Sequence, residues 1–175
     1  MTEFWDIKKS ETDVFIDHLL LNRGVSLDKK LKEAFFRPNF KKGLFDPFLM
    51  TGMSLAVKRV EHAKKINERI GIFADYDADG IPGAAVLYRA LIQIGFEVVV
   101  YIPNRESGYG LSREGIDYLS ESNRSLIITF DLGIRSIDEA IYCKEKKIDL
   151  IITDHHLPDT RLPEALAVLN PKIPK

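Results

Sequence analysis

Hydrophobic residues follow two different patterns along this chain, and the change falls near residue 70. Before it, apolar residues have helical spacing, most clearly at positions 53, 56, 57, 60, 63 and 66. The segment DVFIDHLLLN also predicts a helix that stops at Gly24, and Ser26 or Asp28 could cap a helix in LDKKLKEAFF. We therefore expect a helical lead-in over residues 1–69.

From residue 70 onward, short apolar runs rich in β-branched residues alternate with helical patterns. The runs are RIGIFAD, FEVVVYIP, SLIITFD and IDLIITD, and ALAVLNP could begin a fifth. Between them lie the helical patterns PGAAVLYRALIQIG, SREGIDYLSES and SIDEAIYCKEKK. Such alternation is typical of βαβ units, whose parallel strands are covered on both faces. The sequence thus predicts an α/β fold over residues 70–175, with a parallel sheet of four to five strands and helices on both faces.

Composition narrows the function classes. The 175 residues carry a net charge of −1, which argues against a dedicated, strongly basic nucleic-acid binder. No apolar run approaches the roughly 18 residues of a membrane helix, and the N-terminus does not resemble a signal peptide. A single cysteine, Cys143, excludes an intramolecular disulfide and fits a reducing compartment. We read Cys143 as a helix filler and expect a cytoplasmic protein that does not enter a membrane.

Acidic residues and histidines follow three of the predicted strands. They are Asp75, Asp77 and Asp79 after the first strand, Asp131 after the third, and Asp154, His155 and His156 after the fourth. Ligands of open α/β sheets bind outside the carboxyl ends of the strands. In an extended segment alternate residues face the same way, so the first three carboxylates should converge and repel one another unless a cation intervenes.

Each motif also has a structural interpretation. A single Asp at a strand end often caps the next helix, and a lone pair of histidines is more often solvated than metal-bound. DYDADG resembles a calcium loop, but Val86 stands where that loop needs Glu. The three motifs together favour a shared metal site. Carboxylates and imidazoles without thiolate suit Mn²⁺, with Mg²⁺ as the alternative. Two such ions about 4 Å apart, bridged by a carboxylate, are an arrangement that hydrolyses phosphate esters.

Four sequence blocks resemble RecJ-type single-stranded-DNA exonucleases of the DHH phosphoesterase superfamily. LLLNRG, LKEAFFRP, LFDPFLMTGMSLAVKRVEHA and ERIGIFADYDADG are similar to the lead-in and first motif of that family. YIPNRESGYGLS resembles its second block, FDLGIRSIDEA its third, and IITDHHLPDTRLPEALAVLNPK its DHH block. The blocks occur in order with similar spacing and cover almost the whole chain.

The resemblance implies a two-Mn²⁺ site that hydrolyses phosphodiesters from a 5′ end. The catalytic residues that it implies are Asp131 as bridging carboxylate, His155 as ligand and His156 beside the scissile phosphate. The implied metal-site residues are Asp75, Asp77, Asp79, Asp131, Asp154 and His155, of which Asp154 could instead orient a histidine. The implied substrate-binding residues are Arg105, Gly108, Tyr109, Gly110 and His156.

Two positions depart from the family pattern. Ile81-Pro82-Gly83 stands where relatives often carry small hydroxyl residues. We expect Pro82 at the first position of the helix, and Gly83 to leave backbone N–H groups open to a phosphate. Leu132 replaces a residue that is often polar or Cys in relatives. We expect a small effect from each departure.

Family members also have a further Asp ligand and a closing domain beyond the DHH block, and neither has a counterpart before the final LNPKIPK. We therefore expect a C-terminal domain or a second chain to complete the site, and weak or no turnover by this chain alone. The expected substrate is single-stranded nucleic acid, DNA rather than RNA. Two alternatives stay open: a DHH phosphodiesterase acting on short oligonucleotides or cyclic dinucleotides, and a non-catalytic scaffold for a replication or repair partner. A dinucleotide-binding domain is disfavoured because no GxGxxG follows the first strand.

Overall fold

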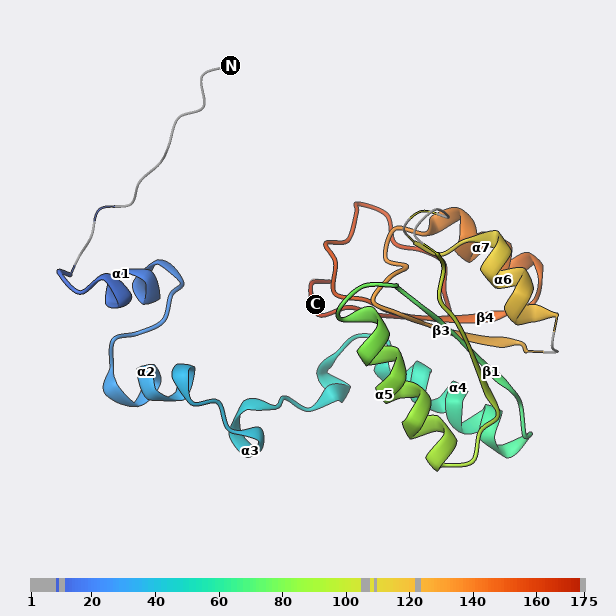
Figure 1. Cartoon of the computed structure of the whole chain (residues 1–175), viewed down its shortest axis with the longest axis horizontal. Helices are drawn as coiled ribbons and strands as arrows, with labels where there is room; N and C mark the ends of the chain where they lie inside the picture. The colour runs from blue at the N-terminus through green and yellow to red at the C-terminus, as the bar shows by residue number, and fades with distance from the viewer. Residues whose placement is uncertain (1–8, 10–11, 105–107, 109, 122–123, 174–175) are drawn as a thin grey trace, which may run out of the picture. The chain divides into compact units, whose positions relative to one another are not determined.

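The computed structural model describes residues 9, 12–104, 108, 110–121 and 124–173 (Figure 1). The chain divides into two compact units, Met1–Asp46 and Pro47–Lys175. None of the helices in the described ranges is both long and apolar enough to cross a membrane.

The first unit is helical, as the sequence predicts. It contains α1 (Phe15–Asn22), α2 (Lys29–Phe36) and α3 (Phe40–Gly43). Asp28 caps α2, because its Oδ1 accepts the backbone N–H groups of Lys30 and Leu31 at 2.9 and 3.2 Å. This confirms one of the two predicted caps. An ion pair between Asp17 and Lys32 joins α1 to α2.

The second unit contains a five-stranded parallel sheet, which confirms the predicted fold class. Its strands are β1 (Ile70–Ala74), β2 (Val98–Tyr101), β3 (Leu126–Phe130), β4 (Asp149–Thr153) and β5 (Ala167–Leu169). They lie in the order β2-β1-β3-β4-β5. A short 3₁₀ helix (Pro47–Leu49) comes first, and the α-helices are α4 (Met53–Lys65), α5 (Gly80–Gln93), α6 (Arg113–Ser120) and α7 (Ile137–Glu145).

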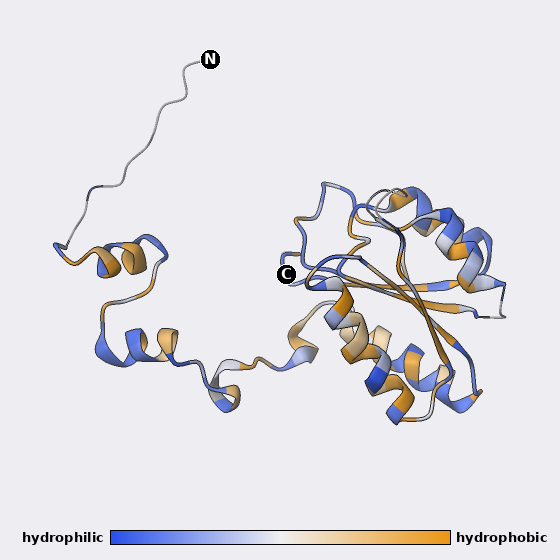
Figure 2. Ribbon diagram, in the orientation of Figure 1, coloured by the Kyte–Doolittle hydropathy of each residue, from blue (hydrophilic) through white to orange (hydrophobic). Residues whose placement is uncertain are grey.

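Helices cover both faces of this sheet (Figure 1). On one face α4 and α5 pack against alternate strand residues such as Ile72 and Ile128, and on the other α6 and α7 pack against Phe73 and Ile127. The strands are accordingly hydrophobic along their length (Figure 2). Cys143 of α7 is buried in the second layer, and burial raises the pKa of its thiol to about 12. That environment suits a packing residue and not a nucleophile.

Helix α4 belongs to the same unit as the sheet, because Ala56 and Ala63 lie in the core cluster that contains the strands. The boundary between the two units therefore falls between residues 46 and 47 of the chain, whereas the change of sequence pattern falls between residues 69 and 70. The pattern marks where strands begin, and it cannot show which preceding helix packs on them.

Arg59 fastens α4 to the amino-terminal edge of the sheet. Its Nη1 and Nη2 donate to the two carboxylate oxygens of Glu68 at 2.7 and 2.8 Å, and its Nε donates to Asp149 at the start of β4. Ser125, just before β3, donates to the same Glu68 carboxylate. The side chains of Arg59 and Glu68 are only 11% and 6% exposed, so the pair is shielded from solvent.

Replacing Arg59 with Met is expected to lower the free energy of unfolding by about 2–4 kcal/mol at neutral pH, because Glu68 would keep a buried charge without its partner. Chemical denaturation measures the change. The matched control is Arg69→Met, which breaks the exposed Arg69–Glu97 pair and should cost less than about 1 kcal/mol. Equal losses of unfolding free energy in the two variants would contradict the expectation that the buried ion pair contributes more than the exposed one.

The same pair predicts a pH dependence. The hydrogen bonds from Arg59 are the main cause that holds the pKa of Glu68 below its usual range. An unfolded Glu titrates near pH 4.3, about its ordinary value. The stabilisation is therefore complete above that pH and is lost as the pH falls through the lower folded-state pKa. The difference in unfolding free energy between the wild type and Arg59→Met should narrow on acidification, and a constant difference would contradict this prediction.

Candidate metal centre

Three loops meet at the carboxyl edge of the sheet. Asp75 follows β1, Asp131 follows β3, and residues 154–156 follow β4. Since β1, β3 and β4 are neighbours in the sheet, the loops that leave them are adjacent although they are far apart in sequence.

Asp131 lies at the centre of this edge in an unusual backbone conformation. Its φ of 63° is in the left-handed region, which Asp and Asn tolerate better than most residues. Thr129 Oγ1 donates to the carbonyl of Leu132 at 2.8 Å, and the Asp131 N–H donates to the carbonyl of Thr153 at 2.9 Å. These bonds hold the turn that directs the Asp131 carboxylate, whose side chain is only 3% exposed.

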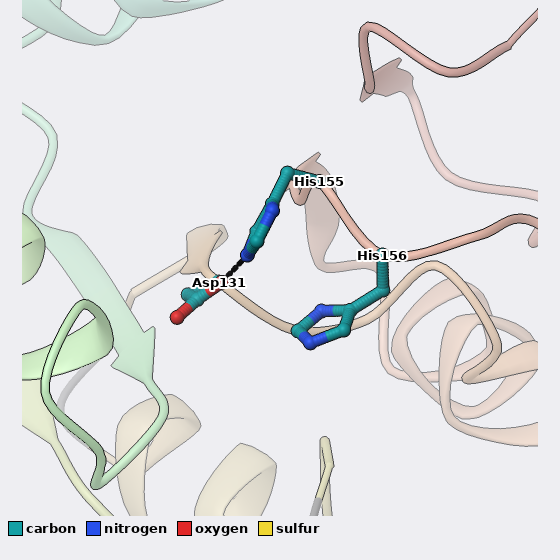
Figure 3. A group of neighbouring side chains, drawn as sticks. All are labelled: Asp131, His155 and His156. Carbon is teal, nitrogen blue, oxygen red and sulfur yellow. Dashed lines mark ion pairs between the residues drawn. The ribbon is translucent and has the colours of Figure 1, made fainter. Parts of the chain in front are cut away.

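The structure brings together two groups of potential metal ligands, and Asp131 belongs to both. One group is Asp131, His155 and His156, and the other is Asp75, Asp77 and Asp131. Within each group the ligand atoms lie within 4.8 Å of one another. Figure 3 shows the first group, in which His155 Nε2 lies 2.9 Å from Asp131 Oδ1. The His156 ring lies beside these two side chains.

The electrostatics of the site favour a cation. Burial, followed by the charge of Asp79, raises the pKa of Asp131 to about 6. Burial is also the main cause that raises the pKa of Asp75. Carboxylates in this state need a proton or a positive charge nearby. Oxygen and imidazole donors without sulfur are those that Mn²⁺ and Mg²⁺ accept, so the residues present fit either metal.

Asp77 and Asp79 are not placed near the site by an extended backbone, as we expected, but by a turn. After Asp75 the chain turns and does not stay extended, so the alternation argument fails beyond that residue. Asp77 Oδ1 accepts the N–H groups of Asp79 and Gly80 at 3.3 and 3.0 Å. A Cβ on Gly80 would lie 2.6 Å from the Asp75 carbonyl oxygen, so glycine lets this loop close. Asp79 Oδ2 lies 3.4 Å from His155 Nε2, outside both ligand groups.

The prediction of a phosphate site at the start of α5 is wrong. The helix begins at Gly80, so Pro82 is its third residue and not its first. The N–H groups of Ile81 and Gly83 donate to the carbonyls of Asp77 and Asp79, and the Gly80 N–H is already taken by Asp77. Gly83 instead allows close packing, because a Cβ there would lie 1.9 Å from Cε1 of Phe130.

Asp154 lies beside His156 and is absent from both ligand groups. Its Oδ1 accepts the N–H groups of His155 and His156 at 2.7 and 2.9 Å and lies 2.7 Å from Nδ1 of His156. Its Oδ2 accepts the N–H of Ile134 at 2.9 Å, and the side chain is 1% exposed. Burial opposes ionisation, but these hydrogen bonds outweigh it and lower the pKa of Asp154. Asp154 therefore orients the His156 ring through Nδ1.

Sequence reasoning missed Asn170, which follows β5. Its Nδ2 donates to the carbonyl of His156 at 2.9 Å, and its Oδ1 accepts the N–H of Lys172 at 2.8 Å. Only 3% of the residue is exposed, so these bonds satisfy a buried amide. The Asn-Pro pair directly after an apolar run was the available signal.

The expected substrate-binding residues are only partly visible. Arg105 and Tyr109 lie outside the described residues. Gly108 and Gly110 have φ angles of 85° and 106°, which glycine adopts without strain. Gly110 and His156 both line a cavity of about 560 Å³.

Comparisons with known proteins agree with this geometry. Residues 69–175 match the DHH family, N-terminal domain. The chain is 35% identical to the single-stranded-DNA-specific exonuclease RecJ of Bacillus subtilis (strain 168), over 97% of this chain and 23% of the relative. It is 36% identical to RecJ of Haemophilus influenzae, over 90% of this chain and 27% of the relative.

Solved structures show the same similarity. A crystal structure of exonuclease RecJ bound to manganese superposes with a TM-score of 0.67 and 34% identity, covering 73% of this chain and 33% of that one. RecJ from Thermus thermophilus in complex with Mn²⁺ gives a TM-score of 0.60 and 33% identity, covering 70% of this chain and 17% of that one.

A fold and site of this kind, with these matches, define a phosphoesterase-type α/β domain. The chain belongs to the DHH family. Its curated relatives are RecJ proteins, and it spans about a quarter of the length of the two described above.

Proposed function

We propose that this chain carries the metal centre of a RecJ-type exonuclease, which hydrolyses single-stranded DNA from its 5′ end with two Mn²⁺ ions. The observation that carries the proposal is the position of Asp131 in both ligand groups. A buried carboxylate shared by two neighbouring groups is the arrangement that a bridging ligand requires. Mg²⁺ is the alternative metal, since the donors accept it as well.

The proposal gives each residue a role. Asp75 and Asp77 would hold one ion with Asp131, and His155 would hold the other, with Asp79 within reach of it. His156 would face the scissile phosphate, and Asp154 would fix its ring through Nδ1. When bound, the ions would supply Lewis-acid activation of the phosphate and of water. Among the expected substrate-binding residues, Gly108 and Gly110 would let the DNA approach the backbone, and Arg105 and Tyr109 would contact the DNA as well.

The relatives support the substrate and the setting. Their names specify single-stranded DNA, which favours DNA over RNA and over short or cyclic nucleotides. A C-terminal domain or a second chain that completes the site is part of the proposal, because the relatives are about four times longer. A cytoplasmic location, expected from the sequence, is also part of it.

Calorimetric titration of the chain with Mn²⁺ tests the metal centre without requiring turnover. We expect binding of two ions, with the affinity at one site lost in His155→Ala. The matched control is His62→Ala on α4, which should bind as the wild type does. Absence of Mn²⁺ binding, or equal binding by the His155 variant, would contradict the proposal.

The substrate is tested by Mn²⁺-dependent nucleotide release from 5′-labelled strands, with the chain joined to the C-terminal domain or second chain that completes the site. Single-stranded DNA should be degraded in preference to duplex DNA, single-stranded RNA and cyclic dinucleotides. A preference for dinucleotides would instead support the small-nucleotide phosphodiesterases of this superfamily. Intact DNA binding by a variant without metal ligands, and no hydrolysis under any condition, would support a scaffold.

A further inference from the structure

The cavity beside His156 has features that the metal centre does not use. Its volume of about 560 Å³ is within the range of small-molecule sites. Loops from four parts of the sheet edge line it, including Gly110, Gly133, Arg135, Ser136, His156 and Lys172. Because His156 lines this cavity and also belongs to one ligand group, the cavity adjoins the metal centre directly.

Two cationic residues, Arg135 and Lys172, line the cavity, and a hydrogen bond to another residue holds each of them in place. Arg135 Nε donates to the carbonyl of Leu157 at 3.2 Å, which leaves the two terminal nitrogens of its guanidinium available. Lys172 follows Asn170, whose side chain holds the Lys172 N–H. Within the described part of the chain, neither cation forms an ion pair. Their charges are therefore available to a ligand.

Two acidic residues also line the cavity, and within the described residues neither pairs with Arg135 or Lys172. Asp154 lines the cavity, but both its oxygens already accept hydrogen bonds from His155, His156 and Ile134. Glu139, in the first turn of α7, is the other acid among the described lining residues. Asp154 and Glu139 balance the formal charge of the two cations, but neither carboxylate forms an ion pair with them in the part of the chain that the structure describes. A guanidinium with two free nitrogens matches phosphate oxygens, so these unpaired cations favour an anionic ligand.

We propose that this cavity binds the phosphate next to the scissile one in the DNA strand, with Arg135 and Lys172 contacting its oxygens. The inference rests on the proposed function, since a strand whose scissile phosphate lies at the metal centre must continue past His156. The contacts would be to the backbone and not to base edges, so they would position the strand without reading its sequence.

Equilibrium binding of a short fluorescent dT strand tests this proposal by anisotropy, at several salt concentrations in Mn²⁺ buffer. Phosphorothioate linkages in the strand limit hydrolysis. Arg135→Ala and Lys172→Ala should each weaken binding roughly tenfold. The double variant Arg135→Ala/Lys172→Ala should also reduce the slope of log affinity against log salt by about 0.7, the value for one phosphate contact on a single strand. Glu139→Gln should change affinity in the opposite direction and strengthen binding.

The matched control is Arg161→Ala, which removes an exposed cation outside the cavity. It should leave affinity within about twofold, because an exposed charge outside the cavity is screened by salt. A second comparison uses TpT, whose only phosphodiester is the scissile one, and TpTpT, which has a neighbour. Arg135→Ala should weaken binding of TpTpT and leave TpT unchanged.

Two outcomes would overturn the inference: losses in Arg135→Ala and Lys172→Ala no larger than in Arg161→Ala, or equal losses for TpT and TpTpT. Calorimetry with Mn²⁺ separates this result from the proposed function. If the wild type binds Mn²⁺ and the cavity variants bind DNA normally, only the inference fails. If the wild type binds no Mn²⁺, the proposed function itself fails.

Discussion

Asp131→Asn is expected to abolish Mn²⁺ binding at both ion positions and to remove any Mn²⁺-dependent hydrolysis. Asparagine preserves the shape of the side chain and tolerates the φ of 63° at this position, so the turn after β3 should persist. The change removes the one charge that both ligand groups share. Calorimetric stoichiometry should fall from two ions to none, and hydrolysis should decrease by a factor of at least about 10³, the scale of a lost catalytic electrostatic contact.

The same variant should be more stable than the wild type when no metal is present. Burial raises the pKa of Asp131 to about 6, so its ionised form is disfavoured in the folded state at neutral pH. Asp131→Asn should increase the free energy of unfolding by about 1–3 kcal/mol at pH 7.5. The matched control is Asp77→Asn, which lies in one group only and should lose one ion. Loss of stability in metal-free Asp131→Asn, or retention of an ion, would contradict this account.

Asp154→Asn is expected to have the second-largest effect, through His156 and not through a lost metal ligand. One amide oxygen cannot replace two carboxylate oxygens, so the Nδ2 of asparagine would face either the Ile134 N–H or the N–H groups of His155 and His156. We expect a loss of about 2–4 kcal/mol in unfolding free energy, the scale of buried donors left without acceptors. Mn²⁺-dependent hydrolysis should fall about 10–100-fold, the usual scale for a lost group that orients a histidine of a metal site.

Nitrogen chemical shifts of the histidine rings distinguish orientation from ligation. In the wild type, Nδ1 of His156 should carry the proton that is shared with Asp154, and this signature should disappear in Asp154→Asn. The control is Asp159→Asn, an exposed acid in the same loop that contacts Thr160. If the His156 signals were unchanged in Asp154→Asn, Asp154 would not be the residue that orients the ring.

The sheet and its helices could be predicted because each element carries a local signal. Buried parallel strands require continuous apolar runs, such as LIITF before Asp131, and the helices between them keep their own spacing. Topology rules then bring the strand ends to one edge, so Asp131 and His155 could be placed together from sequence. This prediction depended on bringing the strand ends to one edge of the sheet, because the sequence itself shows no contact between these two residues.

What could not be predicted depends on backbone geometry after the strands end. The turn at Asp77 takes the N–H groups that a phosphate would have used at α5, and Pro82 gives no sign of this. Arg135 lacks a local signal, because its partner Leu157 reaches it only in the folded protein. The Asn-Pro pair marks Asn170 but does not show that its side chain binds the carbonyl of His156. Side chains that act through a neighbour's backbone are therefore the ones that sequence patterns miss.

The pairing of β1 with β3 has a kinetic consequence. Ile70 aligns with Leu126 in this parallel ladder, and α5, β2 and α6 all lie between the two strands along the chain. Closing so long an interval costs chain entropy before any contact repays it, which raises the contact order and slows folding. The ligand groups cannot form until that ladder has formed. Mn²⁺ should therefore leave the refolding rate nearly unchanged and slow unfolding, because the ion would bind after the rate-limiting step.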